Sequence, residues 1–189
     1  KFICPYDSIS QEIRDNFFDY SSIENVEILP QITRIGISAF ENCEKIHRID
    51  FLKNSKLQII DKNAFKNTAL ENIIIPSEVI EIGEGSFSLW NQLRKIEFAN
   101  DSKFQTIGKE AFSGSPIESL TIPSKVIELK EGWSIGVNKI TKINVSSSNP
   151  LFKVYNDNKM IIGKTSIESS NYNCLIFCVR NIKYVKIPN

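Results

Sequence analysis

One apolar pattern, repeated about every 23 residues along most of the chain, constrains the fold more than any other feature of the sequence. Its clearest copy runs from Ile75 to Phe98 and reads IPSEVIEIGEGSFSLWNQLRKIEF. A fixed period of 20 to 50 residues is typical of solenoids, in which each unit buries its apolar face only by stacking on its neighbours. The sequence therefore predicts a single elongated core.

Three sets of apolar positions keep the same register. An aromatic residue marks each unit, at Phe18, Phe40, Phe65, Phe87, Phe112 and Trp133. The gaps between these aromatics are 22, 25, 22, 25 and 21 residues, so short and long units alternate. A second set follows each aromatic as an apolar-x-x-apolar-x-apolar ladder that ends at Ile28, Phe51, Ile75, Phe98, Ile122 and Val145. A third set precedes the aromatics and ends at Ile35, Ile60, Ile82, Ile107 and Leu129.

The second set predicts one short strand in each unit. Its last two apolar residues, such as Ile73 and Ile75, have the period of a strand with one buried face. Stacked at about 4.8 Å, such strands would bond edge to edge and join their apolar faces. Prolines that lack an N–H end these ladders, at Pro30, Pro76 and Pro123. The long units insert turn residues after the strand, at 52–55 and 99–102.

The rest of each unit is expected to be turns. Glycines follow the third set and predict tight corners, at Gly36, Gly83 and Gly108. The segment that holds each aromatic is too short for more than one helical turn. At the N-terminus, residues 1–22 form either a degenerate first repeat or a cap, and 23–145 hold the regular repeats. Residues 146–189 form an irregular final unit with an insertion, before Ile182-x-x-Val185-x-Ile187 resumes the strand pattern.

Composition excludes several functional classes. The formal net charge is +1, from 23 basic and 22 acidic residues, so no broad electrostatic attraction to nucleic acid or anionic membrane is expected. No apolar run approaches 18 residues, so we expect no membrane insertion. Four cysteines do not make a disulfide framework. In a straight strand Cys174 and Cys178 would lie roughly 13 Å apart, beyond the reach of a disulfide, so buried reduced thiols are the simpler interpretation.

The repeat resembles the BspA-like leucine-rich repeat family. The resemblance rests on the pattern Pro-x-x-Val-x-x-Ile-Gly-x-x-Ala-Phe-x-x-Cys-x-x-Leu-x-x-Ile-x-Ile-Pro, matched by residues 32–51 with Ala39-Phe40 and Cys43, and again by 57–75, 76–98 and 104–122. It implies a right-handed, curved, β-rich solenoid with parallel strands on the concave face and short helical or 3-10 segments elsewhere. It also implies a surface or secreted protein that takes part in adhesion and protein binding, with no catalytic residues and no cofactor.

Residues that alternate with the core positions of the strands would face outward and are the candidate ligand-binding set. One column holds Asn25, Arg48, Asn72, Lys95, Ser119 and Lys142, and its neighbour holds Glu27, Asp50, Ile74, Glu97, Thr121 and Asn144. The residues predicted to contact a ligand are Arg48, Asp50, Asn72, Ile74, Lys95, Glu97, Thr121 and Lys142. The alternative is an ordinary, self-neutralising surface.

Other singled-out residues have structural explanations. Trp90 aligns with Cys43 and is expected to be buried, although an exposed interface anchor is the alternative. Trp133 is expected in the core, and His47 at the surface. Asn156-Asp157-Asn158 lacks the glycine and distal glutamate of a calcium loop, so it predicts a turn and no metal site. Two N-glycosylation sequons begin at Asn100 and Asn144, and their use depends on the compartment.

Three functional hypotheses remain at the level of sequence. The first is a non-enzymatic interaction module of a cell-surface or secreted adhesin, which binds host or matrix proteins through the concave sheet. The second is an intracellular scaffold built from the same repeats, so a cytoplasmic location stays open. The third is an inert spacer in a longer surface protein. No nucleophile–base pair, phosphate loop or metal cluster favours an enzyme.

Overall fold

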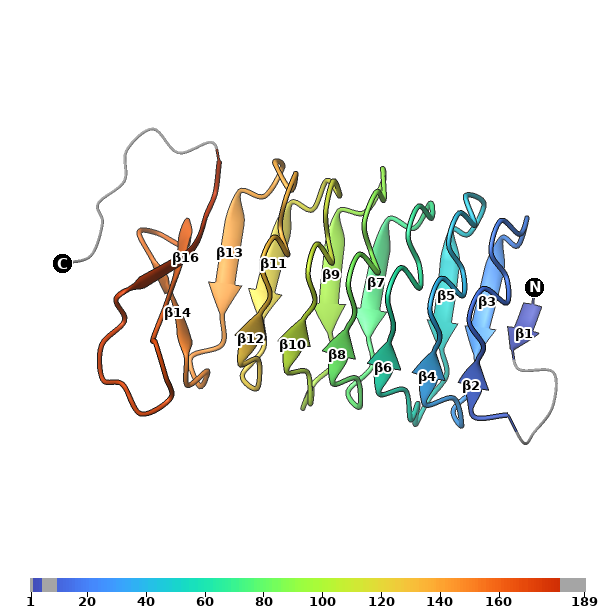
Figure 1. Cartoon of the computed structure of the whole chain (residues 1–189), viewed down its shortest axis with the longest axis horizontal. Coiled ribbons are helices and arrows are strands. Elements are labelled where there is room, and N and C mark those ends of the chain that lie inside the picture. Colours follow the sequence, from blue (N-terminus) through green and yellow to red (C-terminus); the bar gives the residue numbers. More distant parts are fainter. Residues whose placement is uncertain (1, 5–9, 181–189) are drawn as a thin grey trace.

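The fold is a stack of similar units, each of which turns once around a shared core (Figure 1). The computed structural model describes residues 2–4 and 10–180. In Figure 1 two rows of short strands run along the long axis, one in front of the other, and a small separate sheet lies at the C-terminal end. Long and short units alternate, as predicted from the spacing of the apolar residues.

The first row contains the strands that the sequence predicts. The predicted strands are β3 (Asn25–Ile28), β5 (Arg48–Phe51), β7 (Asn72–Ile75), β9 (Lys95–Phe98), β11 (Ser119–Ile122) and β13 (Lys142–Val145). A further strand that was not predicted, β1 (Phe2–Cys4), joins the row at its N-terminal end. Every pairing in this row is parallel, and each pair joins consecutive units. Most inward-facing residues of these strands, such as Ile73 and Leu120, are almost completely buried, whereas Ile49, Phe51, Phe98 and Val145 are partly buried.

A second parallel sheet was not predicted. Its six strands are two residues long: β2 (Glu12–Ile13), β4 (Arg34–Ile35), β6 (Ile59–Ile60), β8 (Glu81–Ile82), β10 (Thr106–Ile107) and β12 (Glu128–Leu129). From β4 to β12, each strand ends on a residue of the third apolar set; Ile35, Ile60, Ile82 and Ile107 are buried, and Leu129 is partly buried. Two residues per strand are too few to show an alternating pattern, and this is why sequence reasoning took them for turns.

A column of stacked aromatic rings forms the centre of the core. Phe18, Phe40, Phe65, Phe87 and Phe112 lie ring over ring, with centroids 5.1 to 6.0 Å apart. Trp133 is buried, as expected, but it stands at 85° to Phe112. The amide of Phe112 donates to the carbonyl of Trp133, whereas the amide of Phe87 donates to that of Ala111. Trp133 therefore occupies the position of the alanine before each phenylalanine, and the sequence alignment there is wrong by one residue.

The segments that carry these aromatics contain no helix in the described part of the chain, so the expected helical and 3-10 segments are absent there. They are runs of turns in which alternate N–H groups donate to the next unit. The amides of Asn16, Phe18 and Tyr20, for example, donate to the carbonyls of Ile37, Ala39 and Glu41. Residues on either side of each aromatic have positive φ, which a helix cannot accommodate. The N–H groups between the donors to the next unit, such as those of Phe17 and Asp19, donate three residues back within the unit, so bonds between units alternate with single turns.

The glycines after the third apolar set each begin a turn, as predicted, because the carbonyls of Gly36, Gly83 and Gly108 accept hydrogen bonds from the amides three residues later. A left-handed backbone is not the reason that glycine is needed there. The φ angles of these glycines are not positive; instead, the preceding unit lies too close for a side chain. A Cβ atom at Gly108 would lie 2.5 Å from the carbonyl carbon of Gly83. The glycines are therefore needed for backbone approach between units.

The final unit departs from the repeat. It contains an antiparallel sheet next to β13, made of the strands β14 (Phe152–Tyr155), β15 (Met160–Gly163) and β16 (Cys174–Cys178). Phe177 from this sheet contacts Trp133, with ring centroids 5.3 Å apart. The sheet therefore covers the aromatic column at this end of the stack. The strand pattern expected at Ile182 to Ile187 lies outside the described residues.

Candidate functional site

The outward face of the first row of strands carries the predicted ligand-binding residues in two columns. Paired positions match the sequence alignment: Asn25 lies opposite Arg48, Asn72 opposite Lys95, and Ser119 opposite both Lys95 and Lys142. The neighbouring column is aligned in the same way, with Glu27 opposite Asp50, Ile74 opposite Glu97, and Thr121 opposite Asn144. We call this surface the strand face.

The strand face has an ordered distribution of charge. Its basic side chains lie in the column near the amino ends of the strands, and its acidic side chains lie two residues further on. Within β5, Arg48 pairs with Asp50 at 2.8 Å, and within β9, Lys95 pairs with Glu97 at 2.6 Å. All four side chains are more than a third exposed, so each pair contributes at most about 1 kcal/mol. Lys142 is exposed and has no ion-pair partner among the described residues.

Ile74 is the large apolar residue of this face. Its side chain is 58% exposed, while its neighbours Ile73 and Ile75 point inward and are buried. It is surrounded by polar side chains of both columns. An exposed isoleucine between polar neighbours offers apolar contact area that no other part of the molecule covers.

The sheet of the strand face is interrupted between β5 and β7. Strands β1, β3 and β5 form one hydrogen-bonded sheet, and β7, β9, β11 and β13 form another. Where two consecutive strands stay paired, the residue after the later strand donates its N–H to the last carbonyl of the earlier one: Leu52 to Ile28, Ala99 to Ile75, and Ser146 to Ile122. The residue after β7 is Pro76, which has no N–H. That hydrogen bond to the carbonyl of Phe51 cannot form.

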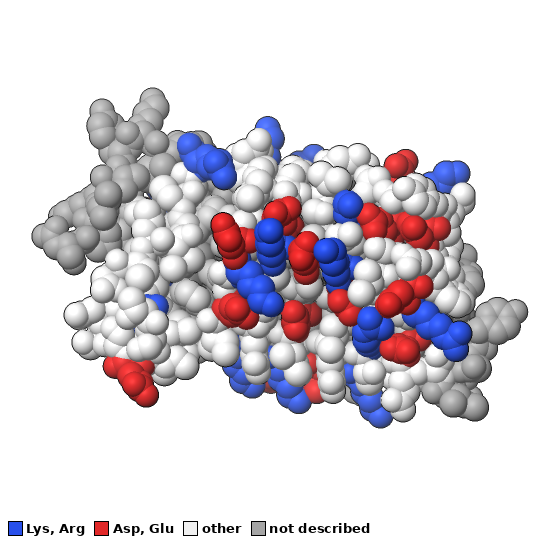
Figure 2. Space-filling model, in the orientation of Figure 1, with Lys and Arg blue, Asp and Glu red and all other residues white. Residues whose placement is uncertain are grey.

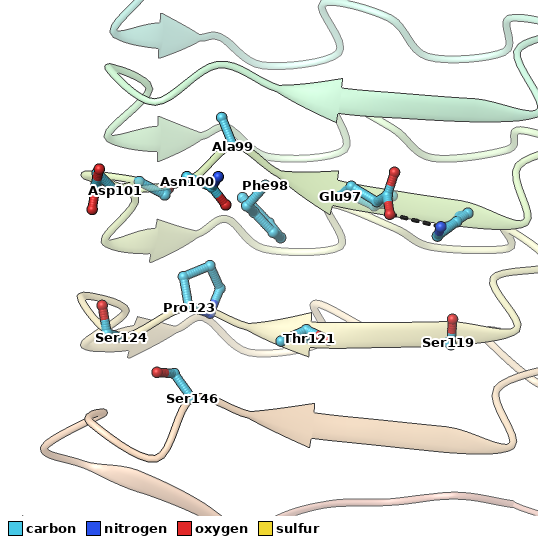
Figure 3. Close-up of a pocket in the computed structure, with 13 residues that line it drawn as sticks. Glu97, Phe98, Ala99, Asn100, Asp101, Ser119, Thr121, Pro123, Ser124 and Ser146 are labelled. Carbon is cyan, nitrogen blue, oxygen red and sulfur yellow. Dashed lines mark ion pairs between the residues drawn. The ribbon is translucent and has the colours of Figure 1, made fainter.

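A hydrogen bond is lost in the same way between β9 and β11. Pro123 follows β11, so the corresponding hydrogen bond to the carbonyl of Phe98 is also missing. Here the strands remain in register only at Ser119 and Lys95, near their amino ends. Figure 3 shows Phe98 between the two strands, and its ring stacks on that of Phe104 with centroids 4.7 Å apart. Phe51 and Phe98 are consequently half-buried, whereas Ile28, Ile75 and Ile122 at the same position are fully buried.

Each interruption opens a groove. The groove between β5 and β7, the first groove, has a volume of about 610 Å³, and the second groove, between β9 and β11, has about 500 Å³. Most positions that line the first groove have an equivalent 47 residues later that lines the second groove. The interval is 47 residues because one long and one short unit together have that length. The matching pairs include Asp50 and Glu97, Phe51 and Phe98, Asn54 and Asp101, Ser55 and Ser102, Ile74 and Thr121, and Pro76 and Pro123.

The opposite side of the molecule carries ion pairs with structural roles. Arg34 lies among Asp61 at 2.8 Å, Asp15 at 3.0 Å and Glu12 at 3.3 Å, and so connects three units. Burial lowers the pKa of Arg34, but the hydrogen bonds and charges of Asp61 and Asp15 raise it more, so its pKa lies above the ordinary value. Figure 2 shows basic and acidic side chains intermixed across the units, without a large patch of one sign in this view.

Other groups considered in the sequence are placed as follows. Trp90 is fully buried and His47 is exposed, as expected. Cys43 is a buried free thiol. The free thiols of Cys174 and Cys178 are half-exposed, because both lie on β16 in the antiparallel sheet at the C-terminal end. The segment 156–158 forms the turn between β14 and β15. Asn100 is exposed beside the second groove, whereas the Asn144 side chain accepts a hydrogen bond from Asn158 at 3.0 Å.

Among the described residues, no group of three or more His, Cys, Asp or Glu side chains is placed to hold a metal ion. No helix in the described ranges has the length and apolar character needed to cross a bilayer.

Parallel strands stacked in units of about 23 residues define a leucine-rich repeat solenoid, a class of protein built around extended binding surfaces. Within that class the chain belongs to the BspA type leucine rich repeat family, whose model matches residues 11–133 in six copies. The sequence-based identification of the family is thus confirmed.

Solved structures agree with this assignment. The chain is 27% identical to the pneumococcal vaccine antigen PcpA, with a TM-score of 0.76 over 82% of this chain and 40% of that one. A leucine rich cell surface protein from Faecalibacterium prausnitzii shares 21% identity, with a TM-score of 0.61 over 82% of this chain and 47% of that one, and shows the fold alone. The chain therefore spans less than half the length of either protein. A comparison with curated proteins found no match.

Sequence reasoning found both columns of the strand face but missed the grooves. The sequence did contain a signal for the grooves. Proline directly follows β7 and β11, and the strand one unit earlier ends in phenylalanine in both cases, at Phe51 and Phe98. Pro76 and Pro123 do end their own strands, as predicted, but they also remove a hydrogen bond to the preceding strand of the row.

Proposed function

We propose that this chain is a non-catalytic protein-interaction module of a cell-surface or secreted protein and that it binds protein ligands through the strand face. The observation that carries the proposal is the strand face itself, on which exposed Ile74 lies among basic and acidic columns. Family membership supports an interaction role. The likeness to PcpA, described as a vaccine antigen, and to a cell surface protein supports a surface location.

The contact residues in this proposal are Arg48, Asp50, Asn72, Ile74, Lys95, Glu97, Thr121 and Lys142. The charges of Arg48, Asp50, Lys95 and Glu97 are held in exposed pairs that contribute little to folding, so a ligand can replace these pairs at small energetic cost. The near-zero net charge supports a protein ligand and disfavours nucleic acid. We also propose that residues 1–189 act as one repeat domain, since the antiparallel sheet packs directly against β13.

The test is capture of ligand by immobilised protein from extracellular-matrix and cell-surface extracts, beside a cytosolic extract. A triple variant, Arg48→Ala with Lys95→Ala and Lys142→Ala, should lose selective capture from the surface extract without a change in melting temperature. The matched control replaces three exposed lysines away from the strand face, Lys62, Lys109 and Lys130, and should capture as the wild type does.

Two other outcomes would favour different functions. Capture from the cytosolic extract alone would favour an intracellular scaffold. Equal capture by the wild type and the triple variant would contradict a binding role for the strand face, and no capture from any extract would favour an inert spacer.

A further inference from the structure

We propose that the two grooves of the strand face are equivalent arginine-binding sites, so that the protein ligand is one that presents two arginine side chains about 10 Å apart. The inference rests on the proposed function and specifies the chemistry of its ligand. It starts from the repetition of the grooves, since features 47 residues apart recur at Phe51 and Phe98, Pro76 and Pro123, and Asp50 and Glu97.

Each groove combines three features that one type of side chain can satisfy. A half-exposed phenylalanine ring forms its apolar part, at Phe51 or Phe98. The proline opposite leaves the carbonyl of that phenylalanine without its usual donor. An exposed carboxylate lies at the groove, from Asp50 or Glu97.

Arginine fits this combination better than any other side chain. Its methylene stem can pack on apolar surface while its guanidinium stays at the groove mouth. The guanidinium stacks on aromatic rings and carries five N–H donors, enough for both a backbone carbonyl and a carboxylate. Lysine supplies a charge but neither the planar stacking nor the forked donors.

The charge of the grooves points the same way. Both open beside the acidic column of the strand face, and Asp101 adds an exposed carboxylate to the second groove. Among the lining residues, Asp50, Glu97 and Asp101 are acidic and Lys95 alone is basic. The exposed pairs of Asp50 with Arg48 and of Glu97 with Lys95 compete with an incoming arginine, but pairs of this kind are weak.

The spacing of the grooves sets the spacing of the arginines. The grooves are two units apart, so two strand spacings separate them by about 10 Å. A ligand segment in the polyproline II conformation rises about 3.1 Å per residue with three residues per turn, which places every third side chain on one side at about 9 Å. Two arginines separated by two prolines therefore match the two grooves.

The proposal can be tested with a fluorescein-labelled peptide, Gly-Arg-Pro-Pro-Arg-Gly, by fluorescence anisotropy with the whole chain. The peptide should bind at least tenfold more tightly than one with a single arginine, because the second contact is intramolecular. Replacement of both arginines by lysine should weaken binding severalfold, and replacement by glutamate should abolish it.

Variants of the protein identify the site. Pro76→Ala with Pro123→Ala restores both missing N–H donors, and should weaken binding at least tenfold while the melting temperature is maintained or raised. Pro116→Ala, a proline outside both grooves, is the matched control. Asp50→Asn with Glu97→Gln should also weaken binding at least tenfold, and this variant tests the site even if the proline variant folds poorly.

Removal of the competing cations separates this inference from the proposed function. Arg48→Ala with Lys95→Ala frees both carboxylates and should strengthen peptide binding severalfold, although the triple variant is expected to lose the protein ligand. No binding of the peptide at millimolar concentration, or binding unchanged by both the proline and the carboxylate variants, would overturn the arginine sites. Ligand capture that still depended on the basic column would leave the interaction module standing.

Discussion

The indole N–H of Trp90 donates a hydrogen bond to the backbone carbonyl oxygen of Phe65, one unit earlier in the stack. The same position in two other units makes the equivalent hydrogen bond with a different side chain, whereas the buried hydroxyl of Thr68 at this position makes none. The Cys43 thiol donates to the carbonyl of Phe18 at 2.9 Å, and the Ser115 hydroxyl to that of Phe87 at 2.7 Å. Thus a side-chain donor at this position satisfies a buried carbonyl next to the aromatic column, and it links consecutive units.

Trp90→Phe is expected to destabilise the protein by about 2 kcal/mol or more, because it leaves the buried carbonyl of Phe65 without that donor and removes part of a buried ring. Chemical denaturation followed by circular dichroism measures the loss. Leu93→Met, a nearly volume-conserving change at another fully buried site, is the control and should cost less than about 1.5 kcal/mol. A Trp90→Phe variant as stable as this control would mean that the hydrogen bond contributes nothing.

Leu89→Asn should stabilise the protein by about 0.5 to 1 kcal/mol. Leu89 has a φ of 59°, a conformation that costs most side chains about 1 kcal/mol and that asparagine tolerates better. The equivalent residues of the two preceding units are Asn42 and Asn67, which are joined by a side-chain hydrogen bond of 3.1 Å. Leu89→Ala keeps the unfavourable φ and is the control. Equal melting temperatures for the two variants would contradict the prediction.

Ile73→Asp should destabilise the stack by about 4 kcal/mol or more, since it buries a carboxylate that has no partner. The adjacent Ile74 provides a matched control, because its side chain is 58% exposed while that of Ile73 is 4% exposed. Ile74→Asp should leave the melting temperature nearly unchanged. If the two variants melted together, the inward and outward directions of β7 would be wrong. Leu120→Asp is expected to behave as Ile73→Asp does.

Acid should weaken the stack partly through Glu41. Burial raises the pKa of this carboxyl, but Lys66 at 2.8 Å and the hydroxyl of Ser38 lower it more, so the pKa lies below the ordinary value. A lowered carboxylate pKa stabilises the folded state above the pKa of the unfolded chain, and that contribution disappears as pH falls through the folded value. The free energy of unfolding should therefore decrease below about pH 4.5. Glu41→Gln should show a smaller decrease, and an identical pH profile would exclude this contribution.

Cys43 should react with iodoacetamide far more slowly than Cys174 or Cys178. Its thiol is fully buried, and burial raises its pKa despite the hydrogen bonds with Ser21 that lower it. The thiolate is the reactive form, so both access and ionisation are reduced. Mass spectrometry of the peptides after brief labelling of the native protein measures the rates. Comparable labelling of the three thiols in the native state, and not only in denaturant, would contradict the burial of Cys43.

The apolar period by itself determined the solenoid class, the positions of the strands and most of the core, and the family resemblance added that the strands are parallel. Ile28, Ile75 and Ile122 are buried where the pattern placed them, because a stack repeats the same contacts and a single unit reveals them all. The two columns of the strand face followed from alternation along each strand. In these respects local pattern and tertiary structure coincide, since the neighbours of each residue are its own counterparts in adjacent units.

The tertiary structure decided the features that depend on contacts between unlike residues. Trp133 lies one position earlier in its unit than the phenylalanines do in theirs, at the position equivalent to Ala111. Its ring nevertheless follows that of Phe112 in the stack. Glycines are required at Gly83 and Gly108 by the approach of the preceding backbone, which no local pattern records. The grooves arise because Pro76 and Pro123 remove a hydrogen bond from strands that end some 25 residues earlier, and only the folded stack brings each proline to the carbonyl that it leaves without that donor.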